Sequence, residues 1–234
     1  MWLSELLESE GELERDVHVT QIALDSRHIQ LGGVFFALLG HQQHGLQFAL
    51  SVQAQGAVAI VYDPYHAPKE ILQAVQAIPM IAVENLGAKL GGIAARFYGN
   101  PSHKLNVIGI TGTNGKTSCS QFLAQMLEST AVIGTLGNGL IEHLQDSKNT
   151  TPDAFEVQKL LANFVAQNIK NVAMEVSSHA LVQGRVNALH FRGAVFNNLS
   201  RDHLDYHGDM QSYFQAKMGL LRTKELEFVV VNAD

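Results

Sequence analysis

The chain has 234 residues, of which 46% are hydrophobic and 16% charged, and its net charge is −6. This composition indicates a globular protein with one large or two smaller domains. The lack of a basic cluster argues against nucleic acid as the main partner, and no apolar run approaches the length of a membrane span. The acidic start, residues 1–16, is not typical of a signal peptide, and the single cysteine, Cys119, excludes an internal disulfide. We therefore expect a cytoplasmic protein without membrane insertion.

Short apolar runs alternate with helical patterns in the first part of the chain, which predicts an α/β fold with largely parallel sheets. Strands are expected at residues 34–39, 57–62 and 80–83, and helices at 45–55, 69–77 and 86–98. Turn residues at 99–104 then break the pattern. We place a domain boundary there, which gives domains 1–102 and 103–234.

A glycine-rich segment follows this boundary. Residues 109–118 read Gly-Ile-Thr-Gly-Thr-Asn-Gly-Lys-Thr-Ser, after an apolar run at 105–110 and before an amphipathic stretch at 117–128. A strand, a glycine turn, Lys-Thr and a helix are typical of a loop that binds the phosphates of a nucleotide. A standard P-loop would have its first glycine at position 110, so Gly109 lies one residue too early. The alternative is an ordinary glycine turn, which the Gly-Lys-Thr ending disfavours.

Acidic and histidine side chains follow the later strands, expected at residues 171–176, 193–197 and 228–232. Glu175 lies inside an apolar strand, where a carboxylate is costly unless it is paired or binds a metal, and we predict a metal or metal-water ligand. His203 and His207 have the i, i+4 spacing of zinc sites, but the glutamate that a zinc protease carries after its first histidine is missing. Mg²⁺ next to a phosphate loop fits this segment better.

Three further features are ambiguous when taken alone. Asp153 precedes a helical pattern and fits a helix cap. Lys217 lies on an amphipathic helix and fits a solvated lysine. The last predicted strand, at 228–232, should be buried, and a parallel sheet seldom finishes on a strand without a covering helix, so we expect a piece of a longer protein.

Together these segments resemble the Mur ligases, most closely the MurE type, which adds the third residue of the peptidoglycan stem peptide. The matching segments are residues 24–27, 40–43, 111–117, 149–151, 175–185 and 198–209. The resemblance implies a UDP-binding N-terminal domain (1–102), an incomplete central ATPase domain (103–234) and a C-terminal amino-acid-binding domain that this chain lacks.

The resemblance also implies a role for individual residues. The UDP part of the substrate would contact Leu24, Ser26, His41, Gln42 and Gln43, and its sugar-peptide part Asn149, Thr150, Thr151, Ser177, Gln183 and Arg185. ATP would contact Gly112, Thr113, Asn114, Gly115, Lys116, Thr117 and Ser118, where Ser118 replaces the family's usual threonine and keeps a hydroxyl. Mg²⁺ would be served by Thr117, Glu175, His203 and Lys217, the last as a carbamate formed with CO₂. Lys116, His203 and Lys217 would be catalytic.

The implied activity is an ATP-dependent amide ligase. A carboxylate of UDP-N-acetylmuramoyl-L-alanyl-D-glutamate would attack the γ-phosphate of ATP, and an amino acid would then displace phosphate from the acyl phosphate. Meso-diaminopimelate and L-lysine both stay open as that amino acid, and the motifs favour meso-diaminopimelate. Two alternatives are a non-catalytic fragment that binds UDP-sugar and ATP, and a folylpolyglutamate-type ligase, against which Thr117 argues because those relatives usually carry glycine there.

Overall fold

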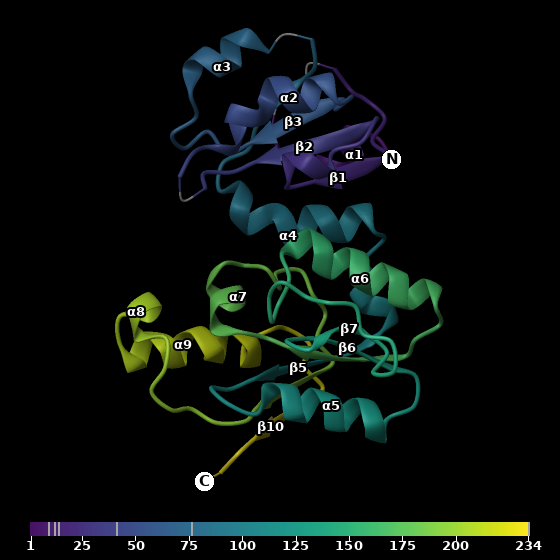
Figure 1. Ribbon diagram of the computed structural model, residues 1–234, viewed down its shortest axis with the longest axis vertical. Coiled ribbons are helices and arrows are strands. Elements are labelled where there is room, and N and C mark those ends of the chain that lie inside the picture. The colour runs from purple at the N-terminus through teal and green to yellow at the C-terminus, as the bar shows by residue number, and fades with distance from the viewer. Residues whose placement is uncertain (9, 12, 14, 41, 76, 234) are drawn as a thin grey trace. The chain divides into compact units, whose positions relative to one another are not determined.

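The computed structural model describes all residues except 9, 12, 14, 41, 76 and 234. The chain divides into two compact units, Met1–Phe97 and Tyr98–Asp234. Each unit contains helices and one sheet that is wholly or largely parallel (Figure 1). The predicted α/β class is therefore confirmed.

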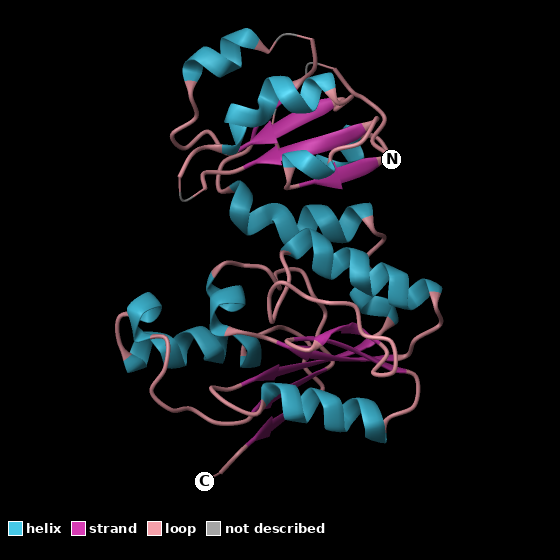
Figure 2. Cartoon of the chain, viewed as in Figure 1, coloured by secondary structure: helices cyan, strands magenta, loops and turns pink. Residues whose placement is uncertain are grey.

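The first unit is built on a four-stranded parallel sheet in the order β1-β2-β3-β4. Figure 2 shows its strands in magenta and its helices in cyan. Its elements are α1 (Leu3–Leu7), β1 (Gln21–Ala23), η1 (Ser26–His28), β2 (Gly33–Ala37), η2 (Gly45–Phe48), α2 (Ala49–Ala54), β3 (Ala59–Tyr62), α3 (Lys69–Ala74), β4 (Met80–Ala82) and α4 (Leu86–Phe97). The predicted strands and helices are all present, with shifted ends. Strand β1 was not predicted.

The second unit has a six-stranded sheet in the order β10-β9-β5-β8-β6-β7, parallel except for the β6–β7 pair. Its elements are η3 (Pro101–Lys104), β5 (Asn106–Thr111), α5 (Lys116–Met126), β6 (Thr130–Gly134), β7 (Gly137–Gly139), α6 (Ala154–Ala166), β8 (Asn171–Glu175), α7 (Ser178–Val182), β9 (Gly193–Phe196), α8 (Leu204–His207), α9 (Met210–Leu221) and β10 (Phe228–Val231). The sequence interpretation missed β6 and β7.

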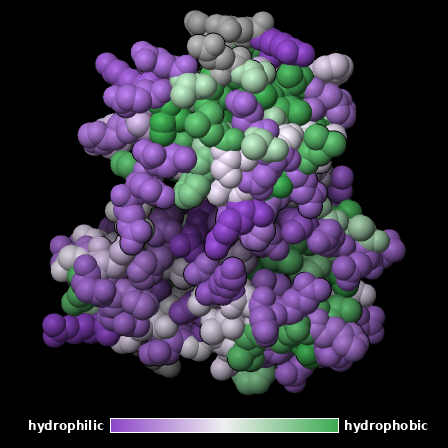
Figure 3. All heavy atoms as spheres, turned by 45° about the horizontal axis from the view of Figure 1, so that its top comes forward, coloured by the Kyte–Doolittle hydropathy of each residue, from purple (hydrophilic) through white to green (hydrophobic). Residues whose placement is uncertain are grey.

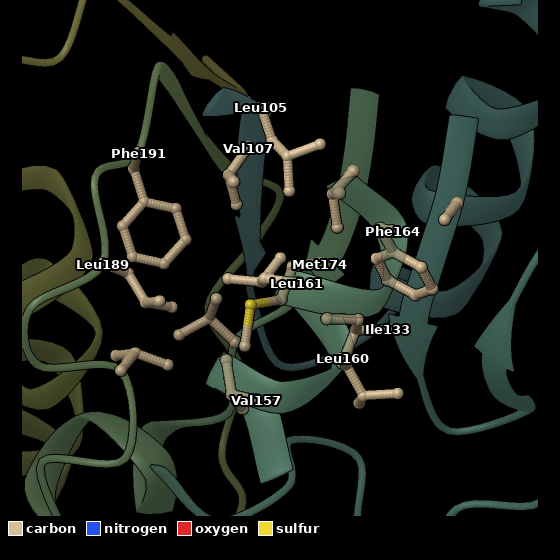
Figure 4. Close-up of a cluster of buried hydrophobic side chains, with 14 of the residues drawn as sticks. Leu105, Val107, Ile133, Val157, Leu160, Leu161, Phe164, Met174, Leu189 and Phe191 are labelled. Carbon is tan, nitrogen blue, oxygen red and sulfur yellow. The ribbon is translucent and has the colours of Figure 1, made fainter. Parts of the chain in front are cut away.

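Both faces of this second sheet are covered. On one face Ile108 and Ile110 belong to a core cluster against which Leu123 of α5 packs. On the other face Val107 lies in a larger cluster with Leu161 of α6 (Figure 4). A strand buried on both faces is apolar along most of its length, which explains the apolar residues from 107 to 110 after Asn106 at the start of β5.

Gly109 belongs to strand β5 and not to the loop that follows it. A Cβ atom there would lie 2.8 Å from Leu220 Cδ1 and 2.9 Å from the Phe191 ring, so the strand can pack against these side chains only with glycine. The first loop glycine is Gly112, whose φ of 152° an L side chain rarely adopts. Gly109 therefore serves packing within the strand and Gly112 serves the turn of the loop, which accounts for the irregular glycine spacing.

The expectation of a buried last strand was wrong. Strand β10 pairs with β9 at the edge of the sheet, and its residues from Phe228 to Val231 are 42–56% exposed. The face in Figure 3 shows a surface that mixes hydrophilic and hydrophobic residues. Within the described part of the chain, no helix is both long enough and apolar enough to cross a membrane.

Candidate active site

The candidate site lies at the carboxyl edge of the second sheet. After the central strand β5, the next strands, β6 to β8, all lie on one side of β5. The chain then crosses to β9, which lies on the opposite side of β5. The order of the strands thus reverses beside β5, and open α/β sheets bind ligands at the carboxyl ends of strands at such a point. The glycine loop follows β5 at this edge, Ser177 follows β8, and Asn197 follows β9.

The glycine loop is held in place by two asparagines after β9. Asn114 N donates to Asn198 Oδ1 at 2.9 Å, and Asn114 O accepts from Asn197 Nδ2 at 2.9 Å and from Asn198 Nδ2 at 3.1 Å. Gly115 has a φ of 78° and directly precedes α5, and a Cβ there would lie 2.4 Å from Asn197 Nδ2. The loop therefore needs glycine at this position to turn into the helix while touching Asn197.

Thr113 anchors the same loop from the other side. Its buried hydroxyl accepts from Ser200 N at 2.9 Å and lies 3.2 Å from Tyr213 Oη. The loop is thus fixed before any ligand arrives, which is what a preorganised phosphate site requires.

Two lysines converge on one loop carbonyl. Lys116 Nζ donates to Gly112 O at 2.9 Å and to Thr113 O at 3.0 Å, and Lys217 Nζ donates to Gly112 O at 2.8 Å. Lys217 is only 1% exposed and lies 4.5 Å from the centre of the Tyr213 ring. The solvated lysine expected from the helix pattern alone was therefore wrong, because Lys217 faces the loop.

Both lysines hold their protons less firmly than usual. Burial, helped by the Lys116 charge and opposed by Asp202, lowers the pKa of Lys217 from 10.5 to about 7. Burial also lowers the pKa of Lys116, against the attraction of Glu175 and Asp202. A neutral amine at Lys217 is therefore accessible near neutral pH.

Glu175 is the buried acid of the site. It is 1% exposed, and its carboxylate accepts from Thr117 Oγ1 at 2.9 Å, from Thr135 Oγ1 at 3.1 Å and from Thr135 N at 2.9 Å. On the neighbouring strand β6, a Cβ at Gly134 would lie 2.1 Å from Glu175 Oε1. Hydrogen bonds and close contact with a glycine thus accommodate the carboxylate, and no salt bridge to it is found within the described residues.

The oxygen atoms around Glu175 fit Mg²⁺. A threonine hydroxyl and a carboxylate are hard ligands, and Mg²⁺ on a nucleotide takes one or two protein oxygens and fills the rest with water and phosphate. In the described part of the chain, no group of three or more His, Cys, Asp or Glu residues could hold a metal by itself. A protein-only zinc site is therefore not formed there by His203 and His207.

The histidines lie in an aromatic cluster beside the loop. The His203 ring is 4.9 Å from the His179 ring, and His203 Nε2 is 3.5 Å from Asp202 Oδ2. His207 Nε2 is 2.9 Å from Ser178 Oγ. No contact joins His203 to Glu175 among the described residues, so a shared metal role for these two side chains stays a prediction.

The polar segment before α6 meets the end of β8. Thr151 Oγ1 donates to Glu175 O at 2.8 Å and accepts from Ser177 N at 3.0 Å. Thr150 Oγ1 lies 3.1 Å from Thr135 Oγ1, and Asn149 O accepts from Ser147 Oγ at 2.6 Å. As expected, Asp153 caps α6, accepting from two backbone N–H groups. The segment therefore touches both the backbone and the surroundings of Glu175.

Arg185 is held in a fixed orientation beside this segment. Its Nη1 donates to Thr151 O at 2.8 Å, and its Nε and Nη2 donate to Gln183 Oε1 at 2.8 and 2.5 Å. Gln183 Nε2 in turn donates to Tyr206 Oη at 3.2 Å. Among the described residues these bonds use three of the five N–H groups of the guanidinium, which leaves one on each terminal nitrogen. A guanidinium held in this way can offer its remaining N–H groups to a carboxylate.

The residues predicted to contact UDP lie in the first unit at the ends of two adjacent strands. Leu24 and Ser26 follow β1, and Gln42 and Gln43 follow the parallel strand β2. Beside Ser26, Asp25 accepts from Arg27, which holds the pKa of the Asp25 carboxyl well below its usual range. His41 lies outside the described residues. The role of this group stays a prediction.

Comparisons with known proteins agree with the geometry of the two units. A family model described as Mur ligase middle domain matches residues 110–234, and one described as Mur ligase family, catalytic domain, matches residues 18–98. The chain belongs to the Mur ligase family. The second match ends close to the boundary between the two compact units at Phe97 and Tyr98.

Curated Mur ligases give the same result over almost the whole chain. UDP-N-acetylmuramoyl-L-alanyl-D-glutamate--2,6-diaminopimelate ligase of Alkalilimnicola ehrlichii is 47% identical over 94% of this chain and 46% of its own length. The protein of that name from Pseudomonas aeruginosa is 46% identical over 95% of this chain and 46% of its own length. The chain thus spans about half the length of the curated relatives it matches.

Solved Mur ligase structures share the fold. A structure titled UDP-N-acetylmuramoyl-L-alanyl-D-glutamate--2,6-diaminopimelate ligase superposes with a TM-score of 0.80 at 30% identity, covering 100% of this chain and 47% of the other. MurF from Acinetobacter baumannii gives a TM-score of 0.68 at 20% identity, covering 99% and 48%, and that likeness concerns the fold alone.

Proposed function

We propose that this chain is the nucleotide-binding and UDP-substrate-binding part of an ATP-dependent ligase. The ligase would join 2,6-diaminopimelate to UDP-N-acetylmuramoyl-L-alanyl-D-glutamate, the reaction named for the relatives at 46–47% identity. The observation that carries the proposal is the double role of Glu175. Its side chain binds Thr117 of the glycine loop, and its backbone carbonyl binds Thr151 of the predicted acceptor segment. One residue therefore joins the nucleotide side to the acceptor side.

The glycine loop would bind the phosphates of ATP. The N-terminus of α5 supplies backbone N–H groups and a partial positive charge. Lys116, which now donates to two loop carbonyls, would turn its ammonium group toward a phosphate. Thr117 and Glu175 would hold Mg²⁺ directly or through water, with His203 as a further candidate. When bound, Mg²⁺ neutralises negative charge on the phosphate oxygens.

Arg185 would orient the acceptor by binding a carboxylate of its peptide. An oxygen of the other carboxylate of the peptide forms a bond to the γ-phosphorus of ATP. The bond from that phosphorus to ADP breaks at the same time, which gives an acyl phosphate. The amine then forms a C–N bond as the C–O bond to phosphate breaks, and the amine releases a proton. The protein contributes positioning and charge stabilisation to both steps.

Lys217 fits the predicted carbamate. Only a neutral amine reacts with CO₂, and the pKa of about 7 makes this form available in a site that is 1% exposed. The modification would exchange a positive charge for a negative one beside the loop.

The first unit would bind the UDP moiety through the strand ends that carry Ser26 and Gln43. We place the functional boundary at residues 102–103, a few residues beyond the division between the compact units. ATP and UDP-linked precursors are cytoplasmic metabolites, so the reaction belongs in the cytoplasm.

The test is calorimetric titration of the chain with UDP-N-acetylmuramoyl-L-alanyl-D-glutamate and with the analogue whose glutamate α-carboxylate, the one that does not attack ATP, is an amide. The matched variant is Arg185→Lys, which keeps the charge but loses the bidentate fork. We expect the parent chain to bind the natural substrate. Binding should be weaker for the amide analogue with the parent chain, and weaker for the natural substrate with Arg185→Lys. Equal affinity for folate and for the UDP-dipeptide would support the folate-type alternative, and no binding of the UDP-dipeptide would contradict the proposal.

A further inference from the structure

Thr135 lies between the two sides of the site, although no sequence motif marked it. It directly follows β6, and its N–H donates to Glu175 Oε1 at 2.9 Å. Its hydroxyl oxygen lies 3.1 Å from Glu175 Oε2 and 3.1 Å from Thr150 Oγ1. Thr135 is therefore in contact with the buried acid of the nucleotide side and with the acceptor segment at once.

The chemistry of these three groups fixes the direction of their hydrogen bonds. A hydroxyl has one hydrogen, and an ionised carboxylate only accepts. The Thr135 hydroxyl therefore donates to Glu175 and is left to accept from Thr150. Thr150 then directs its own hydrogen toward Thr135 and keeps its lone pairs for a donor on a bound molecule. The order Thr150, Thr135, Glu175 is thus an oriented chain that ends on a buried negative charge.

The position of that charge is also fixed. Glu175 cannot move toward the β6 backbone, because its Oε1 already occupies the place that a Cβ at Gly134 would need. On the nucleotide side Thr117 donates to the same oxygen, Oε2, that Thr135 approaches. If a bound metal replaces Thr117 as the partner of Oε2, the hydrogen bond between Oε2 and the Thr135 hydroxyl therefore changes as well.

We propose that Thr135 is a positioning residue that couples the two ligands. It holds Glu175 for the metal of a bound nucleotide and orients Thr150 toward the acceptor substrate. This inference rests on the proposed function. It assigns Thr135 neither a contact with the reacting atoms nor a role as metal ligand. The positioning role predicts that Mg·ADP increases the affinity for the UDP-dipeptide and that the increase depends on the Thr135 hydroxyl.

The experiment measures four affinities by calorimetry for each variant: ADP with and without Mg²⁺, and UDP-N-acetylmuramoyl-L-alanyl-D-glutamate with and without saturating Mg·ADP. Thr135→Val keeps the shape and the backbone N–H bond but loses the hydroxyl, and Thr135→Ser keeps the hydroxyl. The control is Thr130→Val at the opposite end of β6, where the hydroxyl donates to Leu127 O at 2.7 Å.

For Thr135→Val we expect about tenfold weaker binding of Mg·ADP, unchanged binding of metal-free ADP, and loss of the effect of Mg·ADP on the UDP-dipeptide. Thr135→Ser and Thr130→Val should behave like the parent. If Thr135→Val misfolds by circular dichroism, Thr150→Val tests the other end of the chain and should abolish the same coupling. A parent that binds neither ligand contradicts the proposed function itself. A parent that binds both, with coupling that survives in Thr135→Val or in Thr150→Val, overturns this inference alone.

Discussion

Gly134→Ala tests how tightly the fold confines the Glu175 carboxylate. The backbone at Gly134 does not have a positive φ, so alanine itself is tolerated there. The new methyl carbon, however, would lie 2.1 Å from Oε1, 2.8 Å from Cδ and 3.0 Å from Cγ of Glu175. Because β6 and β8 are paired up to Ile133 and Met174, the residues just before Gly134 and Glu175, we expect the carboxylate to move instead of the strands.

That movement breaks the bonds of Glu175 to Thr117 and Thr135 in a site that is 1% exposed. Hydrogen bonds to charged groups contribute about 1.5–3 kcal/mol each, and part of this returns if the displaced carboxylate finds water. We therefore expect the second unit to lose roughly 2–4 kcal/mol of its free energy of unfolding. The affinity for Mg·ADP should fall as well, because Glu175 leaves the position from which it would serve the metal.

The measurement is urea unfolding followed by two signals. The single tryptophan, Trp2, lies in the first unit, so its fluorescence follows that unit, whereas circular dichroism at the helix band follows both. Gly134→Ala should shift only the circular dichroism transition of the second unit. Gly87→Ala is the matched control, since a Cβ at this position of α4 has nothing within 4 Å, and it should not destabilise the chain.

A double variant identifies the cause. Glu175→Ala removes the atoms that the new methyl would meet, so adding Gly134→Ala to it should cost much less than adding it to the parent. Parental stability and parental Mg·ADP affinity in Gly134→Ala would refute the reasoning.

Three further predictions concern the lysines and the first unit. In an active form of the enzyme, Lys116→Ala should cost roughly 3 kcal/mol of transition-state stabilisation, measured as phosphate release, with UDP-dipeptide affinity unchanged; a parental rate would contradict the loop assignment. The pKa of Lys217 is about 7 in the folded chain, whereas that of an ordinary lysine is 10.5, so the free energy of unfolding of the parent should rise with pH between these two values. Lys217→Met should flatten that rise in urea unfolding at a series of pH values. The same rise with pH in the variant and the parent would contradict the burial of a neutral Lys217. Ser26→Ala should weaken UDP-dipeptide binding and leave Mg·ADP binding intact in calorimetry, whereas an equal loss of both would indicate misfolding.

Local patterns predicted the parts of the site that adjoin each other in the chain. The strand, glycine loop and helix around Lys116 form a single segment, and the cost of burying an acid in an apolar strand was enough to mark Glu175. The family resemblance was needed for Lys217, because a helix pattern that favours a solvated lysine gives no sign of a loop carbonyl 105 residues away.

The partners of these groups could not be predicted, because they come from distant segments. Thr135 meets Glu175 from the end of strand β6, 40 residues earlier, and this strand was not predicted; Tyr213 meets Thr113 across 100 residues. The meaning of Gly109 likewise depended on Phe191 and Leu220, which only the fold brings to it. Hydrophobicity indicated strand β10 correctly but did not reveal that it forms an exposed edge.

The most direct test of the proposed ligase is transfer of oxygen from the acceptor to phosphate. UDP-N-acetylmuramoyl-L-alanyl-D-glutamate labelled with ¹⁸O in its glutamate γ-carboxylate is incubated with ATP, Mg²⁺, 2,6-diaminopimelate and the complete protein that contains this chain, and the released phosphate is analysed by mass spectrometry. Attack of the carboxylate on the γ-phosphate predicts one ¹⁸O atom in each phosphate, in amounts equal to the amide formed, and none without the acceptor. Phosphate released without label would show that water attacks ATP and would contradict the proposed reaction.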